Sequence, residues 1–160
     1  MTTATSIPDQ ILPSHASMVH GLLPELGNIE IFSTAGVCLT SLQALKIAYL
    51  AVAVGDKENA ICSASELVSA TLLSKHYDAE YEKCHSIGEN PYFGFEKDFL
   101  RFMLSDGAGA VLLGNKPNDQ GLSFKIEWID MQSYANECPV CMLAGGEFNL
   151  DGSTTSWKMF

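Results

Sequence analysis

The sequence predicts an α/β fold in one domain that spans residues 1–160. Stretches patterned as strands alternate along the chain with stretches patterned as helices, which is typical of a fold with buried strands. The chain is 47% hydrophobic over 160 residues, enough for a core of ordinary size. No Pro- or Ser-rich linker divides it. These three observations point to a single α/β domain.

The N-terminal third predicts a helix followed by a strand. The opening, Thr2–Pro13, is rich in turn-forming residues, and we expect no regular element there. Ser14 can cap a helix that continues to Leu23 as an apolar stripe and ends at Pro24. The alternating, branched residues of 28–33 then predict a strand.

The next elements surround the most apolar stretch of the chain. Residues 38–54 contain one charged side chain, Lys46, and apolar residues fall on nearly every helical face. A helix of this composition is expected to be buried on all sides. Gly55 supplies its stop. Residues 59–63 predict a second strand, and residues 65–73 a further helix.

The second half of the chain is less regular. Residues 75–97 mix turn formers with charged and aromatic residues, which predicts a long surface loop. The small-residue run 105–110 precedes a predicted strand at 111–113. Residues 122–134 alternate and predict a long strand. From residue 136 onward the pattern is weak.

Charge and hydropathy exclude several classes of function. Nineteen acidic and nine scattered basic residues give a formal net charge of -10, which disfavours nucleic acid and anionic membranes as partners. The apolar stretch 44–54 is too short to span a bilayer, and the first residues lack the pattern of a secretory signal. We therefore expect a cytoplasmic protein whose five cysteines are thiols.

Cys38 is the leading candidate for chemistry. It lies between a predicted strand and the start of the apolar helix, where unpaired N–H groups and the helix dipole favour a thiolate. Gly36 permits a tight turn before it. This arrangement resembles a nucleophile elbow with Cys in place of Ser. The alternative is that Cys38 is a small buried side chain, the commonest role of a free cysteine.

Three segments together resemble one enzyme family. They are TAGVCLTSLQALKIAYLAVAVGDKENAICSASE around Cys38, the later FMLSDGAGAVLLG, and the upstream Ala4–Ser6 with Pro13 and Ser14. In this order and spacing they resemble ketoacyl-acyl carrier protein synthase III of the thiolase superfamily. The resemblance covers about Thr3 to Gly114 and continues more weakly to Gly146.

The resemblance implies a partial thiolase-like fold over residues 1–160, with a mixed sheet and a buried central helix. It implies an acyltransferase in which Cys38 accepts an acyl group and its backbone N–H helps to form an oxyanion hole. Asp106, Gly107 and Gly109 would form a structural loop near the Cys38 helix. The parent reaction would be a decarboxylative Claisen condensation in fatty-acid or polyketide synthesis. We expect no cofactor and no metal; acyl-coenzyme A or acyl carrier protein and a malonyl thioester would be the substrates.

The resemblance also implies a homodimer formed along residues 59–63 and a longer parent enzyme. Family members are about twice as long, with an additional opening strand and helix and a second half that supplies a His and an Asn. None of the four histidines here, His15, His20, His76 and His85, stands at the required distance after Cys38. We therefore expect this chain to be one part of a larger enzyme.

Other interpretations remain open at this stage. The chain could be a non-catalytic partner of an active ketosynthase. Cys138 and Cys141 form a CxxC that could bind metal or undergo redox chemistry, although structural zinc needs four ligands. The run 107–109 could be a phosphate loop, but a strand pattern follows it. Cys62 is expected in the core, Cys84 has no partner motif, and Glu66 has no assigned role. The aromatic residues Phe93, Phe95, Phe99 and Phe102 could line an acyl channel or belong to a core.

Overall fold

The computed structural model describes residues 1–73, 102–139, 144–145, 149–153 and 158–159. The chain divides into two compact units. The first comprises Met1–Thr71 and Ser105–Asp130, and the second comprises Leu72–Leu104 and Met131–Phe160. In the second unit, the strands β5 (Ala144–Gly145) and β6 (Lys158–Met159) pair antiparallel. The candidate site lies in the first unit.

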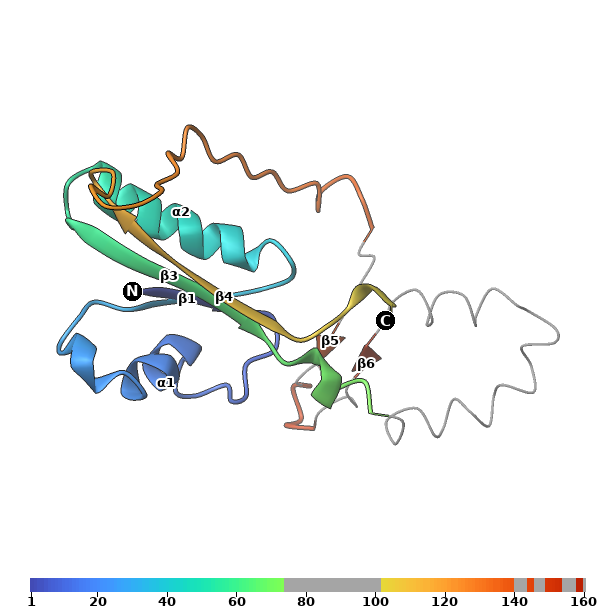
Figure 1. The fold of residues 1–160 in the computed structure, drawn as a ribbon. Helices are drawn as coiled ribbons and strands as arrows, with labels where there is room; N and C mark the ends of the chain where they lie inside the picture. The colour runs from blue at the N-terminus through green and yellow to red at the C-terminus, as the bar shows by residue number, and fades with distance from the viewer. Residues whose placement is uncertain (74–101, 140–143, 146–148, 154–157, 160) are drawn as a thin grey trace. The chain divides into compact units, whose positions relative to one another are not determined.

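The first unit is a mixed α/β structure built on a four-stranded sheet (Figure 1). Its elements in chain order are β1 (Thr2–Thr5), α1 (His15–Gly21), a 3-10 turn (Pro24–Leu26), β2 (Phe32–Ala35), α2 (Thr40–Ala53), β3 (Asn59–Glu66), a second 3-10 turn (Val68–Ala70) and β4 (Gly107–Gly114).

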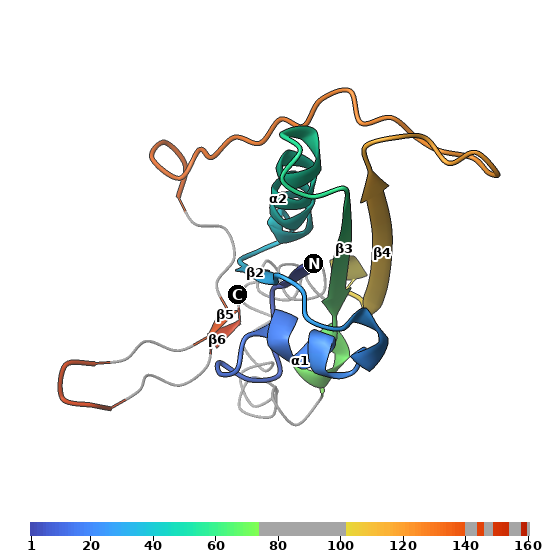
Figure 2. The ribbon, with the colours of Figure 1, turned by 90° about the vertical axis from the view of Figure 1, so that its left-hand side faces the viewer.

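The sheet has the strand order β2-β1-β3-β4. Strand β1 pairs in parallel with β2 on one side and with β3 on the other. Strand β4 runs antiparallel to β3, and Figure 2 shows these two strands side by side. The carboxyl ends of the three parallel strands therefore meet at one edge of the sheet.

The turn-rich interpretation of the opening residues was wrong for Thr2–Thr5, which form the central strand β1. All four residues are buried. Three of the four are threonines, whose branched Cβ favours extended backbone. A strand with neighbours on both edges satisfies its backbone hydrogen bonds, so a mostly polar tetrapeptide can be buried there. The hydroxyls of Thr2 and Thr3 nevertheless have no hydrogen-bond partner among the described residues.

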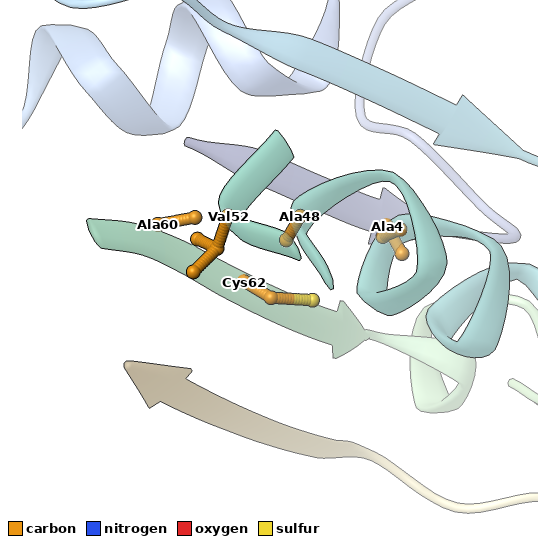
Figure 3. Close-up of a cluster of buried hydrophobic side chains, with 6 residues drawn as sticks. Ala4, Ala48, Val52, Ala60 and Cys62 are labelled. Atoms are coloured by element: carbon orange, nitrogen blue, oxygen red, sulfur yellow. The ribbon is translucent and has the colours of Figure 1, made fainter. Parts of the chain in front are cut away.

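Helix α2 packs on the sheet through small side chains. Its buried residues recur every four positions, at Thr40, Ala44, Ala48 and Val52, and so form one stripe. The stripe meets a cluster of buried residues on the strands, as Figure 3 shows; these are Ala4 of β1 with Ala60 and Cys62 of β3. The expectation that Cys62 is a core residue is confirmed, because it is 6% exposed.

The expectation that this helix is buried on all sides was wrong for the described part of the chain. Leu42 and Leu50 are 42% and 47% exposed. The sheet contacts one face of α2, and the stripe of small residues is that face. The second helix, α1, contacts β1 from the other side, so that the two helices lie on opposite faces of the sheet (Figure 1).

The predicted helix signals fit the structure well. The Ser14 hydroxyl accepts a hydrogen bond from the Ser17 backbone N–H, which confirms Ser14 as the cap of α1. The helix ends at Gly21 rather than Leu23. Gly55 follows the end of α2 with φ of 80°, a left-handed conformation that suits glycine, and its N–H donates to the Val52 carbonyl.

Several predicted elements differ from the structure. The strand expected at 28–33 occupies Phe32–Ala35, and residues 65–66 continue β3 where a helix was expected. Residues 122–134 form no strand, because no neighbouring strand in the described residues pairs with them. The predicted loop 75–97 lies outside the described residues. Within the described ranges, no helix has both the length and the apolar character to cross a membrane.

Candidate active site at the β2–α2 turn

Cys38 lies in the four-residue turn that joins β2 to α2. Strand β2 ends at Ala35 and α2 begins at Thr40, so Cys38 precedes the first helical residue by two positions. Its side chain is exposed, which rules out the alternative that it is a buried core residue. In α/β sheets, ligands bind outside the carboxyl ends of parallel strands, and this turn follows such an end.

Hydrogen bonds to threonine hydroxyls shape the turn. The Val37 carbonyl accepts from the Thr40 backbone N–H at 2.8 Å and from the Thr40 hydroxyl at 2.5 Å. The Thr34 hydroxyl lies 3.2 Å from the Thr3 carbonyl oxygen and 3.1 Å from the Thr40 carbonyl oxygen, between which it shares its proton. The two hydroxyls connect the turn and the start of α2 to the central strand β1.

Gly36 is required at this turn by a close approach. A Cβ built at this position would lie 2.9 Å from the Thr40 hydroxyl oxygen, closer than side-chain atoms approach one another. Thr40 is 2% exposed and its hydroxyl is already bonded, so it has little freedom to move away. The contact with Thr40 is therefore the reason that the turn needs glycine at position 36.

The backbone around Cys38 offers unpaired donors. Among the described residues, no group accepts a hydrogen bond from the Cys38 N–H. Leu39 occupies the cap position of α2 and provides no side-chain hydrogen bond to the helix end. An unpaired N–H beside an exposed thiol can stabilise negative charge that develops on a nearby carbonyl oxygen.

Polar side chains also gather at the ends of the neighbouring strands. The Glu66 carboxylate accepts from the Ser6 backbone N–H at 2.6 Å and lies 3.5 Å from the Thr5 hydroxyl, so it fixes the chain that leaves β1. The Ser65 hydroxyl lies 3.3 Å from Nε2 of His15. No pattern in the sequence indicates this Ser65–His15 pair, because the pair depends on how α1 packs against the sheet.

The glycine-rich run at the start of β4 does not form the loop that the resemblance implies. Gly107 and Gly109 belong to β4, opposite Glu66 and Ala64 of β3, and a Cβ at either position would meet no atom within 4 Å. The strand also excludes the phosphate-loop alternative for 107–109. Asp106, which the resemblance assigns to that loop, instead accepts hydrogen bonds from Ser69.

Asp106 holds the 3-10 turn that follows β3. Its carboxylate accepts hydrogen bonds from the Ser69 backbone N–H at 2.7 Å and from the Ser69 hydroxyl at 2.5 Å. These hydrogen bonds lower the pKa of the Asp106 carboxyl below its usual value, and the bond from the Ser69 hydroxyl has the largest effect. The two hydrogen bonds connect the residue before β4 to the segment after β3.

A cavity of about 330 Å³ lies at the opposite ends of the parallel strands, and Cys38 does not line it. Its walls include Phe32 and Ile47 with Ala51 of α2. At its rim, Lys57 lies 3.1 Å from the Glu30 carboxylate. The cavity and the candidate nucleophile are therefore separate features.

Most of the remaining candidates lie outside the described residues. Cys138 is exposed, whereas Cys141 lies outside the described residues, as do Cys84, Phe93, Phe95 and Phe99. Phe102 is 90% exposed. No group of three or more potential metal ligands occurs within the described ranges.

Both edges of β3 are used inside the chain, by β1 and by β4. Within the segment 59–63, which the resemblance assigns to a dimer contact, all five residues pair with β4, but only Cys62 and Ser63 also pair with β1.

Comparison with known proteins gives a partial likeness to a solved structure. No family model matches the sequence, and no curated protein matches it. Among solved structures, the chain is similar to β-ketoacyl-[acyl carrier protein] synthase III from Thermus thermophilus, with a TM-score of 0.37 and 23% sequence identity. The match covers 43% of this chain and 21% of that protein's length.

Proposed function

We propose that this chain carries the acyl-accepting cysteine of a thiolase-like condensing enzyme similar to ketoacyl-acyl carrier protein synthase III. The observation that carries the proposal is the placement of Cys38: an exposed thiol at the carboxyl end of a parallel strand, beside its own unpaired N–H. The sequence motifs around Cys38 and β4 support the same assignment.

The first step would be acyl transfer. The Cys38 thiolate attacks the carbonyl carbon of an acyl thioester, and the Cys38 N–H donates to the oxygen that becomes negative. The tetrahedral intermediate then collapses, a new carbon–sulfur bond to Cys38 remains, and the bond to the departing thiol breaks. The departing thiolate takes up a proton from solvent. We expect the acyl group to be donated by acyl-coenzyme A or by an acyl carrier protein.

The second step would be carbon–carbon bond formation. A malonyl thioester loses carbon dioxide, the resulting carbanion attacks the acyl carbonyl on Cys38, and the Cys38 thiolate leaves. The resemblance assigns the His and Asn that stabilise the carbanion to a second half of a longer enzyme. We expect this chain alone to accept an acyl group but to form no ketoacyl product.

Acylation of the purified chain tests the proposal. The protein is incubated with acetyl-coenzyme A, and adducts are located by peptide mass spectrometry in the wild type, Cys38→Ala and Cys138→Ala. Cys138 is the matched control because it is also an exposed thiol. We expect an acetyl adduct on Cys38 that persists in Cys138→Ala and disappears in Cys38→Ala. An adduct that survives in Cys38→Ala, or no adduct on Cys38 in the wild type, would reject Cys38 as the acyl acceptor; the second result favours a non-catalytic partner subunit.

A further inference from the structure

The hydroxyl of Thr40 is placed to control the geometry at Cys38. It donates to the Val37 carbonyl at 2.5 Å, and the Thr40 N–H donates to the same oxygen at 2.8 Å. The two bonds close a turn that contains Cys38 between its ends. Because Thr40 is 2% exposed, water competes little for its hydroxyl.

Thr40 is itself held by Thr34 and Gly36. Its carbonyl lies 3.1 Å from the Thr34 hydroxyl, which is also 3.2 Å from the Thr3 carbonyl of the central strand. On the other side, the backbone of Gly36 approaches so closely that a Cβ there would reach the Thr40 oxygen at 2.9 Å. The sheet thus holds the Thr40 backbone through Thr34, and Gly36 limits the space around the Thr40 hydroxyl.

We infer that Thr40 is a positioning residue for Cys38, and that its hydroxyl holds the Cys38 N–H and thiol in the orientation that lets both engage one carbonyl group. The inference deepens the proposed function and rests on Cys38 as the nucleophile. An acyl transfer needs the sulfur at the carbonyl carbon and the N–H at the carbonyl oxygen, so it depends on the turn geometry. Alkylation by iodoacetamide needs the thiol alone.

Two substitutions at Thr40 separate the effect of the hydroxyl from the effect of the side chain's shape. Thr40→Val keeps the shape but replaces the hydroxyl with a methyl group, which cannot approach the Val37 oxygen to 2.5 Å. Thr40→Ser keeps the hydroxyl and removes a methyl group. If the hydroxyl positions Cys38, the valine variant is defective and the serine variant is rescued.

The experiment compares two electrophiles at Cys38 in all three proteins. p-Nitrophenyl acetate measures acylation without any recognition of coenzyme A, and iodoacetamide measures thiol access; adducts are quantified on the Cys38 peptide. We expect the ratio of acylation rate to alkylation rate to fall about tenfold in Thr40→Val, less than the roughly hundredfold or greater loss when an oxyanion donor is deleted, because the N–H is displaced rather than removed. Thr40→Ser should restore most of the ratio.

The outcomes distinguish this inference from the proposed function. A ratio that is equal in the wild type, Thr40→Val and Thr40→Ser overturns the positioning role, as does a loss that Thr40→Ser fails to restore. Alkylation of the buried Cys62 reports unfolding: if it rises in Thr40→Val together with the loss at Cys38, Thr40 has only a structural role. If acetyl-coenzyme A gives no adduct but the ratio follows the expected pattern, the proposed function fails while the positioning role of Thr40 stands.

Discussion

Replacing Ala48 with leucine should destabilise the first unit through overpacking between α2 and the sheet. Ala48 is 1% exposed and faces a cluster of equally small residues, including Ala4 and Ala60 (Figure 3). Although Ala48 also lines the cavity described above, its side chain is 1% exposed, so the three carbon atoms that a leucine adds must displace its neighbours. Overpacking of this kind typically costs about 1–3 kcal/mol, and the helix must move away from the strands to accommodate it.

The magnitude can be read as a melting temperature. A destabilisation of 1 kcal/mol lowers the melting temperature of a domain of 60–100 residues by roughly 4–8 °C, so we expect a fall of at least about 4 °C for Ala48→Leu. Ala53→Leu is the matched control, because Ala53 is an exposed residue of the same helix. It adds the same atoms to the surface and should change stability by no more than about 0.5 kcal/mol.

Thermal unfolding followed by circular dichroism at 222 nm, for the wild type and both variants, measures the difference. If Ala48→Leu and Ala53→Leu melt at the same temperature as the wild type, the tight contact between α2 and the sheet is not present in solution. A fall of equal size in both variants would show that leucine disfavours the helix itself, and would equally refute the overpacking argument.

Two further predictions concern the ends of elements. Ser14→Ala removes the cap of α1 and should lower the free energy of unfolding, measured in urea, by about 1 kcal/mol, whereas Ser14→Asp should retain it. An equal loss in both variants would argue against the cap. The pKa of the Asp106 carboxyl is lowered in the folded protein, so its hydrogen bonds to Ser69 stabilise the fold at pH values above the ordinary pKa of an aspartate. This stabilisation is lost as the pH falls through the lowered pKa of the folded protein. The amide shift of Ser69 should report this loss, and Asp106→Asn should abolish the titration.

The sequence predicted the helices better than the strands. Ser14 and Gly55 act through local backbone chemistry, so the cap of α1 and the end of α2 could be inferred from a few neighbouring residues. Strand β1 could not, because Thr2–Thr5 carry no hydrophobic alternation and are buried only through pairing with β2 and β3. Burial of this strand is a tertiary property that a local pattern does not contain.

The same distinction explains the candidate site. Cys38 was identified from its place between a strand and an apolar helix, and its exposure agrees with a reactive role. The contacts that shape its turn involve Thr3 and Thr34, which are distant from one another in sequence and meet through parallel pairing. For Gly107 and Gly109, the resemblance implied a loop with backbone conformations that suit glycine, whereas pairing with the antiparallel strand β3 makes them part of β4.

The packing face of α2 and the candidate nucleophile are connected by a single stripe of residues. Thr40, Ala44, Ala48 and Val52 recur every four positions, so the side chain that holds the Val37 carbonyl is also the first contact of the helix with the sheet. Alanine at the next two positions lets the helix lie close to β1 and β3, and this distance determines where the Thr40 hydroxyl stands. A substitution at Ala44 or Ala48 that displaces the helix should therefore alter the geometry at Cys38, even though these positions lie six and ten residues away from it. The small residues of the core thus contribute to the function proposed for the turn as well as to the stability of the fold.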